Sequence, residues 1–263
     1  MSHTGGSYTA PPPAYSQVPS SEPSSSREPL VGEDWDVPED FKVGVNVSDC
    51  DVSIRMAFVR KVYSILFAQL FMSTVVAGVM MYNDSVKYWV QTNGWALILS
   101  TISTFILLFA VLWKRLSHPL NLQLLAAFTL SESYSVGTLV TYFDKEIVLQ
   151  ALILTTGIFI GLTLFTMQSK YDFSGMFPYL YTGLWALIIV GLIGYFIPFS
   201  SGFDLAYGII SALIFSGFII YDTFNLMNRL SPELYVVAAL ELYLDFINLF
   251  ISILRILNDL NRS

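Results

Sequence analysis

Cysteine and histidine are nearly absent from this chain, which has one cysteine, Cys50, and two histidines, His3 and His118. A single cysteine excludes an internal disulfide, and two histidines leave too few ligands for the usual histidine-based zinc site. Charged residues are also scarce: they make up 13% of the 263 residues, whereas a soluble domain has about 25%. The chain therefore lacks the composition of a soluble globular domain.

Basic residues are too few and too scattered to form a patch for nucleic acid, so no nucleic-acid partner is expected. The net charge of −7 comes from the first 51 residues, where nine acidic residues outnumber two basic ones. In the remainder of the chain, 11 acidic and 11 basic residues cancel. The acidity is thus a property of the N-terminal segment alone.

Residues 1–50 are rich in Pro, Ser and Gly and poor in aliphatic side chains, so we expect a disordered acidic tail. Pro12, Pro13 and Tyr15 form a PPxY motif, the pattern that WW domains bind as a polyproline II segment. The motif predicts a WW-domain partner, such as a ubiquitin ligase of that type. A chance match in a Pro-rich segment is the alternative.

Long apolar stretches dominate residues 51–263, and 54% of the whole chain is hydrophobic. The stretches are near the length of about 20 residues that spans a bilayer as a helix. The first one begins after residue 60, so it is not a cleavable signal peptide. We therefore predict an all-α polytopic membrane protein with seven transmembrane helices. The predicted spans are Val62–Tyr82, Trp95–Trp113, Leu120–Phe143, Ile147–Met167, Tyr179–Ile197, Leu205–Met227 and Leu234–Leu257.

Lysine and arginine near the span ends predict the orientation, because cytosolic loops carry the excess of these residues. A cytosolic N-terminus places seven basic residues near the cytosolic face and four near the opposite face. The cytosolic set is Arg55, Arg60, Lys61, Lys114, Arg115, Lys170 and Arg229; the opposite set is Lys87, Lys145, Arg255 and Arg262. The count predicts that the N-terminus is cytosolic.

Two aspartates, Asp222 and Asp245, lie inside the last two predicted spans, where a charge costs about 2.5–3.5 kcal/mol on insertion scales. The turn between these spans reads Ser231-Pro232-Glu233, a helix start with Ser as N-cap and Pro at the first helical position. So short a connection predicts antiparallel neighbours, which brings both carboxylates to a similar depth. Two such carboxylates can share one proton and titrate as a pair.

Other acidic residues extend this pattern. Glu132 lies in the third span, and Glu241 lies one helical turn from Asp245 on the same helix face. Acidic residues inside a membrane usually mark ion or proton pathways; the alternative is a hydrogen-bonded pair that only holds two helices together. Arg115, at the end of the second span, is a candidate partner for an ionised aspartate, although it also serves as a topology signal.

Gly157 and Gly161 form a GxxxG motif in the fourth span. The motif permits close approach between two helix backbones. We expect it to contribute to helix packing and assign it no activity.

Several sequence blocks resemble the Bax-inhibitor/Lifeguard family, and in particular its fungal members. The blocks are FVRKVY at 58–63, PLN at 119–121, FTLSE at 128–132, IYDT at 220–223, LYLDFINLF at 242–250 and ILRIL at 253–257. They occur in order over residues 55–257, and the block around Asp245 is the most specific. The resemblance implies a seven-helix fold whose last helix lies in the centre of the bundle.

The resemblance also implies a function: a pH-sensitive calcium leak from an internal store, controlled by an aspartate pair that matches Asp222 and Asp245. These two residues would contact calcium transiently, as a transported ion and not as a cofactor. Arg115 would belong to a latch that closes the channel, with Glu132 and Glu241 as further pore candidates. The family is associated with suppression of cell death and with the unfolded-protein response. The endoplasmic reticulum is the expected membrane, with the vacuole, Golgi and mitochondria as alternatives.

Three other classes of protein share some of these features. An intramembrane aspartyl protease also pairs two aspartates, but its Gly-x-Gly-Asp motif is replaced here by Leu242-Tyr243-Leu244-Asp245. A seven-helix receptor has the opposite orientation, and no Asp-Arg-Tyr follows the third span. A non-conducting scaffold that binds cell-death regulators has no sequence feature against it. We expect no enzymatic activity.

Overall fold

The structure is a computed structural model that describes residues 46–197 and 201–262. Within these residues it contains seven helices of at least 20 residues, as the sequence predicts, together with one shorter helix and three 3-10 turns. In chain order the elements are η1 (Val47–Asp49), α2 (Val52–Tyr82), α3 (Asp84–Thr92), α4 (Gly94–Trp113), α5 (Leu120–Val140), α6 (Lys145–Gln168), η2 (Ser174–Met176), α7 (Phe177–Phe196), α8 (Ser201–Asn228), η3 (Pro232–Leu234) and α9 (Tyr235–Arg262).

Six of the described helical segments are long and apolar enough to cross a membrane, judged by length and composition. The helix outside this set is α5, which is 21 residues long but carries polar side chains along much of its length. It packs between α2 and α4, so its polar groups lie largely against protein. The chain is an all-α polytopic membrane protein.

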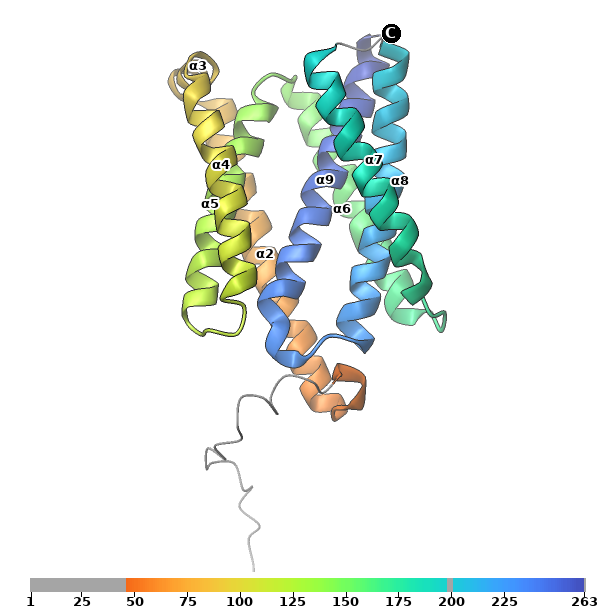
Figure 1. The fold of residues 1–263 in the computed structure, drawn as a ribbon. Helices are drawn as coiled ribbons and strands as arrows, with labels where there is room; N and C mark the ends of the chain where they lie inside the picture. The colour runs from red at the N-terminus through yellow and green to blue at the C-terminus, as the bar shows by residue number, and fades with distance from the viewer. Residues whose placement is uncertain (1–45, 198–200, 263) are drawn as a thin grey trace, which may run out of the picture. The chain divides into compact units, whose positions relative to one another are not determined.

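The last helix occupies the centre of the bundle, as predicted. Among residues in its apolar stretch, 78% are buried, compared with 11% in α4 and in α7. Helix α9 contacts α8, α6, α2, α5 and α4, and Figure 1 shows it between α2 on one side and α8 on the other. The outer helices α4 and α7 instead present large apolar side chains outward, as lipid-facing helices do.

The connection between α8 and α9 is short, and the two helices pack closely against each other. Ser231 has the extended backbone of an N-cap, and Pro232 begins η3, which leads directly into α9. No hydrogen bond from the Ser231 side chain caps this turn. The predicted antiparallel pair therefore forms, with a single turn of 3-10 helix at its start.

The bundle begins within the segment that the composition assigned to the tail. The Val47 side chain is fully buried, and its backbone N–H donates to the Leu230 carbonyl oxygen at 3.0 Å. Residues 46–50 are thus attached to the end of α8. The PPxY motif, Pro12, Pro13 and Tyr15, lies outside the described residues.

Close helix approach occurs at glycines other than the predicted ones. A side chain added at Gly157 or Gly161 would meet no atom within 4 Å, so the expectation that this motif brings two helices together is wrong. At Gly217 a Cβ would lie 2.6 Å from Leu180 Cδ2, and at Gly137 it would lie 2.6 Å from Met80 Sδ. The GxxxG spacing places two glycines on one face of a helix, but it does not determine whether that face packs against another helix.

Candidate functional site: a carboxyl pair on the central helix

Asp222 on α8 and Asp245 on α9 meet at the interface of these two helices. Their side chains interact directly with each other. Two ionised carboxylates can only accept hydrogen bonds, so a hydrogen bond between these groups forms only when one of them carries a proton and donates it. Asp245 is the more deeply buried of the two, with 6% of its surface exposed, while Asp222 is half-buried. The predicted juxtaposition is therefore present.

Unsatisfied oxygen atoms surround this pair. Asn225 lies one turn further along α8 and interacts with Asp222, while the Asn225 Oδ1 atom is buried without a partner. The second oxygen of Asp245, Oδ2, is likewise buried and unpartnered. Buried oxygens of this kind are costly unless water or a cation reaches them. Asn225 was not anticipated, although its i, i+3 spacing from Asp222 was a usable signal.

Glu241 joins the pair as a third acidic group. It lies one turn before Asp245 on α9, is half-buried, and interacts electrostatically with both Asp222 and Asp245. The structure thus brings together three of the four acidic residues that the sequence singled out. A cluster with up to three negative charges attracts cations and favours at least one bound proton.

Three buried hydroxyl groups lie close together where α2, α6 and α8 meet. Tyr63 of α2 lies beside Thr223 of α8 and Thr163 of α6, and none of the three hydroxyls makes a hydrogen bond of good geometry. Thr223 directly follows Asp222. The three unpartnered hydroxyls thus lie together at an interface of α2, α6 and α8.

The opposite face of α9 carries a hydroxyl network that the sequence did not reveal. Ser73 Oγ lies 2.8 Å from Ser133 Oγ and 2.9 Å from Tyr243 Oη. Four residues earlier on both partner helices, Gln69 Nε2 donates to Thr129 Oγ1 at 2.9 Å. The network joins α2, α5 and α9, and all five residues are buried. Polar residues at i, i+4 spacing in two apolar spans were the signal that could have found it.

Glu132 belongs to this second region and not to the aspartate pair. It lies on α5, is half-buried, lies beside Thr104 of α4 and interacts electrostatically with Tyr243. Tyr243 and Asp245 are two residues apart on a helix, so they point in widely different directions. The fourth acidic residue is therefore separated from the other three by α9 itself.

Arg115 lies in the turn that follows α4, and its side chain is exposed. Its carbonyl oxygen accepts a hydrogen bond from Asn121 Nδ2 at 2.9 Å. Within the described residues its guanidinium does not contact Asp222 or Asp245. The latch that the resemblance implies is therefore not formed in this conformation, and its role stays a prediction.

No cluster of three or more His, Cys, Asp or Glu side chains is arranged to hold a metal ion in the part of the chain that the structure describes. Asp222 and Asp245 could supply two carboxylates to a passing cation, with Glu241 close by. Calcium takes six to eight oxygen ligands, so the remaining ligands would have to come from neutral oxygens and water. This arrangement is suited to brief contact rather than to a resident ion.

Comparison with known proteins places this architecture in a family. The sequence profile of the family described as "Inhibitor of apoptosis-promoting Bax1" matches residues 55–262. Bax inhibitor 1 of Schizosaccharomyces pombe is 42% identical over 252 residues, which cover 96% of this chain and 91% of that protein.

Two further relatives come from distant sources. Protein lifeguard 4 of Mus musculus is 45% identical over 227 residues, and the Golgi anti-apoptotic protein of Vaccinia virus (strain Lister) is 43% identical over 227 residues. Each alignment covers 86% of this chain and 95% of the relative. The fungal relative is named as an inhibitor of Bax and the viral relative as an anti-apoptotic protein. The profile match and the identities together show that this chain belongs to the Bax-inhibitor/Lifeguard family.

Proposed function

We propose that this protein is a pH-sensitive, calcium-permeable leak channel of an intracellular membrane. The observation that supports the proposal is the contact between Asp222 on α8 and Asp245 on the central helix α9, with unpartnered oxygen atoms beside it. Acidic groups inside a membrane domain usually belong to ion or proton pathways. Here Asp245 and Glu241 lie on α9, the most deeply buried helix of the bundle, and Asp222 faces them from α8.

The pair provides a gate that responds to protons. When one proton is shared, the carboxyl groups attract each other and hold α8 against α9. When that proton leaves, two like charges in a poorly screened environment repel each other, and the interface is weakened. The same charges then attract calcium, a hard cation that prefers oxygen ligands. Flux should therefore rise as pH rises, since the protonated pair is the closed form.

Calcium flux from liposomes that contain the purified protein tests this gate. The wild-type protein should conduct calcium with a clear dependence on pH between about pH 5 and about pH 8, and Asp222→Asn and Asp245→Asn should each flatten it. Asp172→Asn is the matched control, because Asp172 is a fully exposed aspartate in the loop between α6 and α7. Absent flux, or flux that does not depend on pH in the wild type, would overturn the proposal.

At the level of the cell, we infer a role in calcium homeostasis that suppresses cell death and affects the unfolded-protein response. The description of the family and the name of the viral relative support the part concerned with cell death. The endoplasmic reticulum is the proposed location, and the name of the viral relative favours the Golgi as the second choice. Co-localisation of the tagged full chain with markers of both membranes distinguishes them.

The N-terminal segment is proposed to recruit a WW-domain protein, such as a ubiquitin ligase, through Pro12, Pro13 and Tyr15. Tyr15→Ala should remove binding to an isolated WW domain and leave calcium flux unchanged. Retained WW binding would show that the motif is a chance match.

Two other functions stay open to test. The aspartate contact also suits an intramembrane aspartyl protease, although the residues before Asp245 are Leu242, Tyr243 and Leu244 and not the glycines of that class. Cleavage of a labelled membrane substrate, lost in Asp245→Ala, would establish it. A non-conducting scaffold that binds cell-death regulators would suppress death in cells while giving no flux in liposomes.

A further inference from the structure

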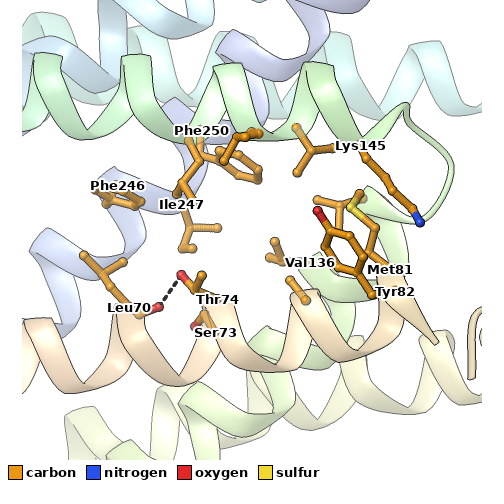
Figure 2. A pocket seen from close by; sticks show the side chains of 16 residues that line it. Leu70, Ser73, Thr74, Met81, Tyr82, Val136, Lys145, Phe246, Ile247 and Phe250 are labelled. Carbon is orange, nitrogen blue, oxygen red and sulfur yellow. Dashed lines mark hydrogen bonds between the residues drawn. The ribbon is translucent and has the colours of Figure 1, made fainter.

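A cavity of about 170 Å³ lies among α2, α5, α6 and α9, away from the aspartate pair. Its wall is mainly aliphatic and aromatic, with Leu70, Met81, Val136, Phe246, Ile247 and Phe250 among the lining residues (Figure 2). An engineered apolar cavity of about 150 Å³ stays dry and binds benzene. The present cavity is therefore large enough for an apolar segment of about that size.

The polar groups in the wall are already satisfied. Thr74 Oγ1 donates to the Leu70 carbonyl oxygen at 2.8 Å, as Figure 2 shows, and Ser73 belongs to the hydroxyl network with Ser133 and Tyr243. Gly78 adds no side chain, and a Cβ placed there would meet no atom within 4 Å. The interior consequently offers no hydrogen bonds to a polar ligand and favours a hydrocarbon chain.

One end of the cavity carries a positive charge. Figure 2 places Lys145 and Tyr82 at this end, with Leu70 and Phe246 at the other. Lys145 Nζ lies 4.6 Å from the centre of the Tyr82 ring, and within the described residues it forms no ion pair. Its sequence neighbours Asp144 and Glu146 are exposed and do not line the cavity. A free ammonium group beside an apolar cavity matches a ligand with one hydrocarbon chain and an anionic head.

The cavity is reached from the outer surface of the bundle. Leu149 of α6 is 56% exposed and Tyr82 of α2 is 69% exposed, and both line the cavity. In a membrane protein such an opening faces lipid, and Lys145 is the first residue of α6, at the end of a membrane-spanning helix where lipid head groups lie.

We propose that this cavity binds one acyl chain of an anionic phospholipid, with the lipid phosphate on Lys145. Membrane lipid is the ligand source because the opening lies on the lipid-facing side. The inference is independent of calcium conduction, since none of its residues belongs to the aspartate cluster.

Native mass spectrometry of the detergent-purified full chain, titrated with phosphatidylglycerol or with phosphatidylcholine of identical chains, tests the site. One phosphatidylglycerol should bind about five-fold more tightly than phosphatidylcholine, the factor that matches about 1 kcal/mol for one lysine near an anionic lipid surface. Lys145→Gln should remove this preference while retaining the binding of phosphatidylcholine.

Gly78→Leu should fill the cavity and reduce the binding of both lipids about ten-fold or more, because the chain loses its apolar contacts. Gly157→Leu is the matched control, since Gly157 is also a mid-helix glycine with open space around it but does not line the cavity. It should bind both lipids like the wild type. Thermal melting in detergent verifies that each variant is folded.

Three results would overturn the proposal: equal affinity of the wild type for the two lipids, unchanged binding in folded Gly78→Leu, or a preserved preference in Lys145→Gln. Displacement of phosphatidylglycerol by an uncharged monoacylglycerol at equal concentration would also overturn it, because the anionic head group would then contribute nothing.

Discussion

The two faces of the central helix α9 differ in the chemistry of their polar groups. Toward α8 it presents Asp245 and Glu241, which meet Asp222. Toward α2 and α5 it presents Tyr243, which meets Ser73 and Ser133. Both faces bury polar atoms at a helix interface, yet the contacts are made by carboxyl groups on one face and by hydroxyl groups on the other, where Glu132 of α5 lies near Tyr243 as an additional acidic group.

This difference predicts that the carboxyl contact depends on pH and that the hydroxyl contacts do not. A hydroxyl group is both donor and acceptor, so the network around Tyr243 stays bonded over the whole range of physiological pH. A pair of carboxyl groups bonds only while it holds a proton, and oxygen atoms such as Asp245 Oδ2 lack a partner in this conformation. We therefore expect pH to change the α8–α9 interface and to leave the α2–α5–α9 interface intact.

The largest effect should come from replacing either member of the carboxyl pair, or both. Asp222→Asn and Asp245→Asn each remove the shared proton, so the double variant should have the same flattened pH profile of calcium flux as either single one, because the two residues act as a unit. Flux from liposomes over about pH 5 to about pH 8 measures this. Additive effects in the double variant would show that the two residues titrate independently.

Glu241→Gln should have a smaller effect on the same face. The change removes a negative neighbour of the pair but keeps the pair itself, so the pH profile should retain its shape and move toward lower pH. The same flux assay measures the displacement. If Glu241→Gln abolished the pH response while both aspartate variants kept it, the gate would be assigned to the wrong acidic residue.

Tyr243→Phe tests the hydroxyl network on the other face. Loss of the phenolic hydroxyl removes its hydrogen bond to Ser73 while the contact between Ser73 and Ser133 remains. Stability should therefore fall by about 0.6 kcal/mol, the average for hydrogen bonds between membrane helices, and by about 1.7 kcal/mol at most. Denaturant unfolding in detergent measures the loss, and the pH profile of flux should not change. Tyr171→Phe makes the same chemical change at a side chain that is 77% exposed and should be neutral. A changed pH profile in Tyr243→Phe would show that the face toward α2 and α5 also takes part in the pH response of the flux.

The smallest effect is expected at Asp172, in the loop between α6 and α7. The backbone N–H of Ser174 donates to its carboxylate at 2.8 Å, and the Ser174 hydroxyl and the more distant Arg229 add to this, so the pKa of Asp172 lies below its ordinary value. The small contribution to stability is present above the ordinary pKa and is lost only as the pH falls through the lowered one. An NMR titration of this carboxyl group measures the shift, and an unshifted pKa would contradict it.

Sequence alone determined the number of long helices and the antiparallel α8–α9 pair that brings Asp222 to Asp245. These two features follow from local quantities: the length of apolar stretches, the turn at Ser231 and Pro232, and the rarity of charge in an apolar span. The central position of the last helix was instead implied by the resemblance to the family. The short helix α3 was missed because its nine residues are too polar and too few to read as a span.

Only the tertiary structure decided which faces of the helices meet. In the tertiary structure Glu132 lies apart from the other acidic residues, and Arg115 is exposed. Close packing occurs at Gly137 and Gly217 and not at Gly157 and Gly161. The hydroxyl network and the lipid-facing cavity are likewise features of the tertiary structure. Each of these features depends on the rotation of one helix about its axis relative to another. That rotation is set by the packing of many side chains at once, so no local pattern in the sequence specifies it.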